Sequence, residues 1–170
     1  AVDAGADEIT VEFQQGGIME ITVRDNGSGI HPEDLSLAIQ RHATSKITSS
    51  DDLNHLDTLG FRGEALASIA SVATVEITSR FESRDEAVRL RKDPDQDTPQ
   101  IEPAARARGT TVRVLDLFQN VPARREFLKT ETTERKHVLR EVRRNVLAHP
   151  GIRFTVKEGD STVLGAPPGN

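Results

Sequence analysis

The sequence of 170 residues contains no cysteine, which excludes a disulfide framework and any zinc site ligated by cysteine. It also has no apolar run near the roughly 18 residues that a membrane helix needs, and no recognisable N-terminal signal peptide. We therefore predict a cytoplasmic protein with no membrane partner. The chain begins at Ala1 and not at a Met, so we also expect a fragment of a longer parent chain.

Several motifs of nucleotide chemistry and catalysis are missing as well. The chain has no G-x-x-x-x-G-K-[ST] sequence, and the glycines after Asp25 do not form G-x-G-x-x-G. Nothing resembles a nucleophile elbow, and the histidines are not paired at metal-ligand spacings. These absences argue against a P-loop, a dinucleotide-binding fingerprint, a serine nucleophile of that type and a histidine-ligated metal.

The composition is that of a soluble globular domain. Hydrophobic residues make up 35% and charged residues 29%, with no signature of disorder across the chain. The length suits one hydrophobic core. We place this domain at residues 1–165 and interpret residues 166–170, which include two prolines and a glycine, as the start of a linker.

Charge is spread unevenly along the chain. The formal net charge of −5 argues against a nonspecific nucleic-acid binder, yet residues 103–157 contain thirteen Lys and Arg against five Asp and Glu. Such a region can attract phosphate backbones, or it can be a solvated helix face. Both interpretations stay open, and the possible DNA contacts are Arg124, Arg125, Arg140, Arg143 and Arg144.

Alternation of apolar and polar residues predicts a hairpin, with strands at 8–13 and 18–24 around a turn at 15–17. Pro32, followed by two acidic residues, predicts the start of a helix. The polar stretch 43–57 predicts a mobile loop or a functional lid. The remaining predictions are a helix at 64–70, strands at 74–80 and 111–115, a flexible loop at 92–103, helices at 124–129 and 134–147, and a hairpin with strands at 152–156 and 162–164.

This order of strands, then helices, then strands predicts an α+β fold. We expect a two-layer α/β sandwich, in which a mixed, mostly antiparallel sheet carries helices on one face. Because the strands alternate and do not form continuous apolar runs, a doubly wound parallel sheet is not expected.

The first candidate site is Asp25-Asn26-Gly27-Ser28-Gly29, at the end of the predicted hairpin. A carboxylate there can accept a hydrogen bond from an exocyclic amine such as that of adenine. The glycines would let the backbone approach a flat ring. Taken alone, the same residues also mark an ordinary turn.

Two further segments have weaker signals of the same kind. Gly60-Phe61-Arg62-Gly63 precedes a predicted helix, whose unpaired N–H groups can bind an anion while Arg62 adds a charge-assisted bond to a phosphate. Gly109-Thr110 begins a strand, and the hydroxyl can support Asp25 or a bound water. Each segment by itself also fits a simple turn or an ordinary strand start.

In combination and in this order, the segments resemble the MutL family. The stretches that carry the resemblance are Asp25-x-Gly27-x-Gly29, Arg41-His42-Ala43-Thr44-Ser45-Lys46, Gly60-Phe61-Arg62-Gly63-Glu64-Ala65-Leu66-Ala67-Ser68-Ile69 and Gly109-Thr110. MutL belongs to the ATPase superfamily that includes gyrase B, the large heat-shock chaperones and the histidine kinases. The second and third stretches are the ones particular to MutL, and the resemblance covers nearly the whole chain.

The resemblance implies a Bergerat-type ATP-binding fold that holds ATP and Mg²⁺ between the helical layer and a lid. It implies that Asp25 binds the adenine amine and that Gly27 and Gly29 make room for the base. It also implies that Thr110 supports the adenine contact through its hydroxyl. The ATP-binding residues implied in this way are Asp25, Gly27, Gly29, Thr44, Arg62, Gly63, Glu64, Ala65, Leu66 and Thr110.

One departure from the family's pattern affects catalysis. The family's first motif is Glu-x-x-x-Asn-x-x-Asp-Ala, and here only Asp3-Ala4 matches its end. The Asn that binds magnesium and the Glu that acts as general base would both precede Ala1. The resemblance therefore assigns no catalytic or metal-binding residue within this chain, and we expect its own ATP turnover to be very low.

The function implied by the resemblance is an ATP-driven switch in DNA mismatch repair. ATP binding and hydrolysis by the parent would be coupled to homodimerisation and would pass a signal from a mismatch-sensor protein to a downstream nuclease or helicase, with weak, nonspecific DNA binding. An alternative is a DNA- or protein-interaction module with a non-hydrolysing nucleotide pocket. A third is another member of the superfamily, such as a topoisomerase subunit or a histidine kinase.

Overall fold

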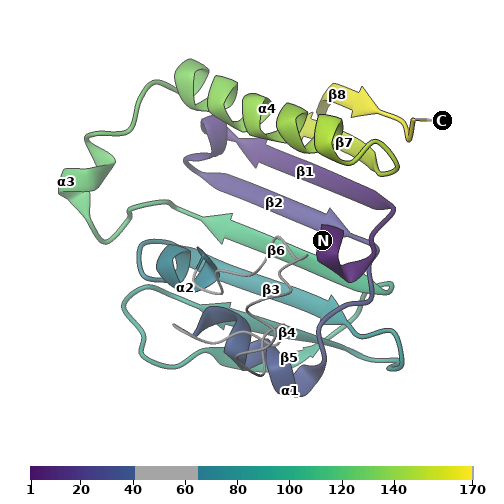
Figure 1. Ribbon diagram of the computed structural model, residues 1–170. Coiled ribbons are helices and arrows are strands. Elements are labelled where there is room, and N and C mark those ends of the chain that lie inside the picture. Colours follow the sequence, from purple (N-terminus) through teal and green to yellow (C-terminus); the bar gives the residue numbers. More distant parts are fainter. Residues whose placement is uncertain (41–64, 170) are drawn as a thin grey trace, which may run out of the picture.

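A computed structural model describes residues 1–40 and 65–169 of the chain. Its centre is an eight-stranded sheet in the order β5-β4-β3-β6-β2-β1-β7-β8 (Figure 1). The strands are β1 (Glu8–Gln14), β2 (Glu20–Asp25), β3 (Thr74–Arg80), β4 (Ala87–Lys92), β5 (Gln100–Ala104), β6 (Gly109–Leu115), β7 (Arg153–Glu158) and β8 (Ser161–Ala166). The helices are α1 (Pro32–Leu35), α2 (Ala65–Ala70), α3 (Pro122–Arg125) and α4 (Glu131–Ala148), with 3-10 segments at Val2–Ala4, Gln15–Gly17 and Ser36–Ile39.

The fold is the predicted one, a mixed and mostly antiparallel sheet with helices on one face. The β1–β2 hairpin pairs Val11 with Val23 and Phe13 with Ile21, so the apolar residues of both strands share one face. Among the described strands, β1 and β7 are the one parallel pair, and they come from opposite ends of the described chain. The predicted C-terminal hairpin is present as β7 and β8, and β8 extends through Ala166.

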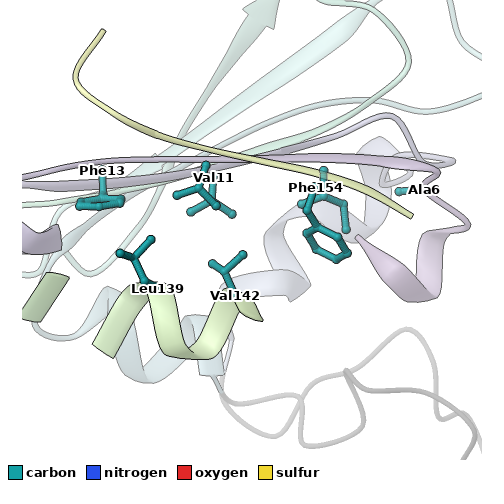
Figure 2. Close-up of a cluster of buried hydrophobic side chains, with 8 residues drawn as sticks. Ala6, Val11, Phe13, Leu139, Val142 and Phe154 are labelled. Carbon is teal, nitrogen blue, oxygen red and sulfur yellow. The ribbon is translucent and has the colours of Figure 1, made fainter. Parts of the chain in front are cut away.

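The long helix α4 covers β1 and β7 (Figure 1). The Thr130 side chain caps it by accepting a hydrogen bond from the N–H of Thr133 at 3.3 Å. In Figure 2, Leu139 and Val142 of α4 point toward Val11, Phe13 and Phe154 of the sheet. This helix therefore anchors one half of the hydrophobic core.

A second cluster of buried side chains lies on the same face of the sheet, over β3 and β4. It consists of Leu35, Ala70, Val75, Ile77 and Leu90, with partly buried residues of α2 packed against it. The predicted helix start at Pro32 is confirmed, but the α-helical turn passes into 3-10 geometry at Ser36–Ile39.

The opposite face of the sheet carries a row of ion pairs. Arg113 of β6 contacts Glu20 at 3.2 Å and Glu76 at 2.8 Å, and Arg91 of β4 contacts Glu76 at 2.9 Å. The pairs run across β2, β6, β3 and β4, and so link four adjacent strands on the side opposite α2 and α4.

The predicted loop at 92–103 is wrong at both ends. Lys92 closes β4, and Gln100 to Ala104 form β5, so the connection is shorter than expected. The prolines and acidic residues of this stretch suggested a loop, but Pro103 stands in a strand at the edge of the sheet. An edge strand tolerates proline because one side of its backbone needs no partner.

The predicted helix at 124–129 is also wrong. The helical segment is the single turn α3, and Phe127 and Leu128 bond to carbonyls only three residues earlier. Phe127 is 82% exposed, so this stretch has no apolar face buried against the sheet. Without such burial a short helix is not maintained, and a new helix starts at the Thr130 cap.

Candidate functional site

Asp25 lies at the end of β2 with its side chain on the helix-covered face of the sheet, and the residue is 8% exposed. Its Oδ1 accepts hydrogen bonds from the N–H of Gly27 at 2.9 Å and of Thr110 at 3.3 Å. Its Oδ2 lies 3.8 Å from the amino nitrogen of Ala1. The two backbone donors fix the orientation of the carboxylate, and Oδ2 accepts no hydrogen bond from the residues that the structure describes.

Thr110 stands opposite Asp25 because β2 and β6 pair in that register. The predicted association of these two residues is therefore present, but the backbone of Thr110 makes the contact. Its hydroxyl lies 2.8 Å from Oγ of Ser79 in β3, a residue that our sequence analysis missed. The sequence places Ser79 on the same inward side of β3 as Val75 and Ile77, but its partner Thr110 is set only by the pairing of β3 with β6.

The glycines of this region permit close approach of other backbone segments. A Cβ on Gly27 would lie 2.8 Å from Cβ and from the backbone oxygen of Ala4, and a Cβ on Gly29 would lie 2.2 Å from the oxygen of Arg80. Gly29 also has a positive φ of 78°. These contacts with the protein itself require glycine at both positions.

Two arginines brace the Asp25 loop through its carbonyls. Arg106 donates to the backbone oxygen of Asp25 at 3.1 Å, and Arg108 donates to that of Asn26 at 3.2 Å. Burial is the largest influence on Arg106 and lowers its pKa, a shift that the charge of Asp25 opposes and those of Arg24 and Arg80 reinforce. The asparagine is held as well, because its Oδ1 accepts from the N–H groups of Asp7 and Glu8.

A groove of about 640 Å³ runs between α4 and the sheet, beside the N-terminal segment. Its lining is mainly aliphatic and aromatic, and includes Val11, Val23, Val142 and Phe154. The ionisable groups in the lining are the carboxylates of Asp3 and Glu141, the imidazole of His137 and the amino group of Ala1.

Of the remaining predicted nucleotide contacts, Ala65 and Leu66 lie among the described residues. Ala65 begins α2 and is exposed, whereas Leu66 packs against the cluster around Leu35. No described contact joins either residue to Asp25. Thr44, Arg62, Gly63 and Glu64 lie outside the described residues, as do the polar stretch 43–57 and most of the two MutL-like stretches.

The five arginines proposed as DNA contacts fall into two groups. Arg124 and Arg125 are on α3, which lies beyond the N-terminal end of α4 (Figure 1), and Arg124 stacks over Phe118 at 5.9 Å. Arg140, Arg143 and Arg144 are exposed in the C-terminal half of α4. The structure therefore does not gather all five on one surface.

No grouping of three or more His, Asp or Glu side chains that could hold a metal ion occurs within residues 1–40 and 65–169. In the same part of the chain, no helix is long and apolar enough to cross a membrane.

Comparison with known protein families assigns the chain to a family of ATPases. The family model described as "Histidine kinase-, DNA gyrase B-, and HSP90-like ATPase" matches residues 1–115. The chain belongs to this ATPase family. The matched region contains Asp25 and Thr110 and the strands β1 to β6.

Within this ATPase family the chain corresponds to the ATPase domain of MutL. It is 48% identical over 164 residues to the DNA mismatch repair protein MutL of Pseudomonas entomophila, covering 96% of this chain and 26% of that protein. It is 48% identical over 168 residues to MutL of Neisseria meningitidis serogroup A, covering 98% of this chain and 25% of that protein.

Solved structures agree with the sequence comparison. The structure of the Aquifex aeolicus MutL ATPase domain complexed with ADP superposes with a TM-score of 0.77 at 30% identity, covering 99% of this chain and 59% of that one. The ATPase domain of the mismatch repair endonuclease MutL from the same organism gives a TM-score of 0.73 at 29% identity, covering 99% of this chain and 56% of that one. The chain thus spans about a quarter of the length of the curated relatives it matches.

Proposed function

We propose that the Asp25 site binds the adenine of ATP. The observation that supports this is the unequal use of the two carboxylate oxygens of Asp25. Two backbone N–H groups donate to Oδ1, and Oδ2 can accept a hydrogen bond from the 6-amino group of adenine. Burial strengthens such a bond because less water competes for the acceptor. The relative solved with ADP supports the same assignment, since it shares this fold over nearly the whole chain.

The test is equilibrium binding of a non-hydrolysable ATP analogue by calorimetry, in the presence of magnesium, to the 170-residue chain and to Asp25→Asn. The asparagine keeps an acceptor for Gly27 and Thr110 but replaces Oδ2 with an amide that donates. We expect binding to fall by more than about tenfold, the loss typical of a hydrogen bond to a charged acceptor. Asp160→Asn, at an exposed hairpin turn, is the matched control and should bind the analogue as tightly as the unsubstituted 170-residue chain does.

Equal affinities for Asp25→Asn and Asp160→Asn would refute the adenine assignment. Absence of binding to the unsubstituted chain, with circular dichroism showing it folded, would leave these 170 residues as an interaction module at most.

We further propose that a polypeptide of these 170 residues turns ATP over very slowly. The resemblance to MutL implies that the general base and the magnesium ligand of the family would precede Ala1. We therefore assign no hydrolytic step to any residue named here. Turnover well above background, in a preparation free of contaminating ATPase, would contradict this.

For the parent protein we propose the role that MutL relatives suggest. ATP and Mg²⁺ binding would favour a homodimer, and the nucleotide state would pass a signal from a mismatch-sensor protein to a downstream nuclease or helicase. The test is whether a non-hydrolysable analogue shifts the parent from monomer to dimer in analytical ultracentrifugation. A sedimentation coefficient unchanged by saturating analogue would contradict it.

A second candidate function, weak and nonspecific DNA binding, is favoured by the exposed face of α4. Arg140 and Arg144 both lie beside Glu141, at 4.0 and 2.9 Å, whereas the neighbouring Arg143 has no carboxylate partner among the described residues. An unpaired, exposed guanidinium can contact a phosphate without first breaking an ion pair. Arg124 and Arg125 on α3 would form a separate contact.

A further inference from the structure

Ser79 is a buried hydroxyl at the centre of the candidate adenine site, and the contacts proposed above do not use it. The residue is 3% exposed and stands in β3, directly opposite Thr110 of β6. Its Oγ has three neighbours, the N–H of Ile30 at 2.8 Å, the backbone oxygen of Gly109 at 3.2 Å and Oγ1 of Thr110 at 2.8 Å. It therefore joins the loop after Asp25 to the start of β6.

The number of protons available decides the direction of these bonds. The N–H of Ile30 can only donate, and the carbonyl of Gly109 can only accept. Ser79 has one hydroxyl proton, so all three contacts are satisfied together only when Ser79 donates to Gly109 and accepts from both Ile30 and Thr110. This arrangement uses every hydrogen-bonding site of the Ser79 hydroxyl, as burial demands.

Thr110 is then left as a pure acceptor. Its proton is committed to Ser79 and its N–H to Asp25 Oδ1, so only the lone pairs of its Oγ1 remain for a ligand or a bound water. The available oxygen of Asp25 is an acceptor as well. Both side chains therefore offer acceptors to whatever lies against them, which suits a base edge that donates and disfavours one that presents a carbonyl.

We propose that Ser79 is a positioning residue that orients the Thr110 hydroxyl and thereby sets the preference of the site for adenine over guanine. The proposal rests on the proposed function, since it assumes that the base lies at Asp25. Adenine presents its 6-amino group where guanine presents a carbonyl oxygen. Without Ser79, the Thr110 proton loses its acceptor and can turn to donate to that oxygen.

The experiment compares ADP and GDP binding to the 170-residue chain, Ser79→Ala and Ser79→Thr. We expect Ser79→Ala to reduce the ADP-to-GDP affinity ratio by about tenfold, the worth of one hydrogen bond. Ser79→Thr keeps a hydroxyl and should retain most of the ratio. Ser71→Ala removes an exposed hydroxyl that donates a hydrogen bond to the backbone oxygen of Ser68, and should leave the ADP-to-GDP affinity ratio unchanged. If Ser79→Ala weakens ADP and GDP equally, the residue is only structural and the proposal is wrong.

A second measurement keeps the proposal testable without any nucleotide. In proton NMR of the ligand-free chain, we expect a slowly exchanging Thr110 hydroxyl proton with a cross-peak to Ser79, absent in Ser79→Ala. Rapid exchange of that proton in the unsubstituted chain would overturn the proposed bond direction. Failure of the unsubstituted chain to bind either nucleotide would refute the adenine assignment and the base preference together, and the NMR result would still decide the orientation of the hydroxyl.

Discussion

Gly109 and Asp25 lie so close that a Cβ added to the glycine would be 2.0 Å from the backbone oxygen of the aspartate. Gly109 also has a φ of 124°, which L side chains rarely adopt. This contact brings the start of β6 against the end of β2. It thereby places Thr110 where its N–H reaches the Asp25 carboxylate.

Substitution of Gly109 should therefore be among the costly glycine changes in this chain. We expect Gly109→Ala to lower the free energy of unfolding by more than about 2 kcal/mol, because backbone strain and overlap add. Gly159 has a positive φ, but a Cβ added there would have no atom within 4 Å, so Gly159→Ala should lower the free energy of unfolding by about 1 kcal/mol. Gly165→Ala has neither problem and should change stability by less than about 0.5 kcal/mol. Urea denaturation measures all three, and equal stabilities for the Gly109 and Gly165 variants would contradict the assignment.

The packing of α4 on the sheet predicts a contrast between two leucines of the same helix. Leu139 is 6% exposed and faces the sheet, whereas Leu147 is 83% exposed. Leu139→Ala should lower the free energy of unfolding by about 2–5 kcal/mol, because it leaves a cavity beside Val11 and Phe13. Leu147→Ala should change it by less than about 0.5 kcal/mol. Thermal and urea unfolding test this, and similar losses for both would mean that α4 is not anchored as described.

The ion pairs on the face of the sheet opposite α4 predict a contrast in stability between two glutamate substitutions. The Glu76 side chain is 11% exposed and pairs with two arginines, while the Glu102 side chain is 62% exposed and pairs with Arg89. Glu76→Gln should cost about 1–2 kcal/mol, a value reduced for the solvent exposure of its partners. Glu102→Gln should cost less than about 0.5 kcal/mol. Urea unfolding of both variants at low and at high salt measures the two losses of unfolding free energy. Equal losses would show that the burial of Glu76 does not strengthen its ion pairs.

The Glu76 carboxylate raises the pKa of its partner Arg91. Burial lowers the pKa of Arg91, but the hydrogen bond to Glu76 and the charges of Asp93 and Glu76 outweigh it and hold the pKa above its ordinary value. Arg91 therefore stays charged in both folded and unfolded chains at any neutral pH. The contrast between the two glutamates should not depend on the titration of this arginine.

Charge reversal on α4 tests the DNA-binding candidate. Arg143→Glu should weaken binding to a DNA duplex several-fold at low salt and reduce the slope of log affinity against log salt by about one or more. Arg153→Glu makes the same charge change on β7, next to the inward-facing Phe154, and serves as the control for net charge. If both variants lose the same affinity in fluorescence anisotropy, the effect is one of total charge and α4 is not the binding surface.

The candidate site was predictable in part. Asp25 and Thr110 were found because both belong to stretches that resemble the MutL family, and the structure brings these distant residues together across β2 and β6. The role of Ser79 was missed, because a single serine in a strand is unremarkable until its partner across the sheet is known. The arginines that brace the Asp25 loop were missed for the same reason.

The sequence by itself determined the local elements. Period-two alternation and the turn at 15–17 specified the β1–β2 hairpin, and the helix predicted at 134–147 lies within α4, since these signals act between near neighbours. Only the tertiary structure decided that β1 pairs in parallel with β7 and that β5 forms an edge strand despite Pro103. It also decided that the helix expected at 124–129 ends after one turn. These outcomes depend on which surfaces find a partner to bury them, and long-range pairing is not encoded in the pattern of any one segment.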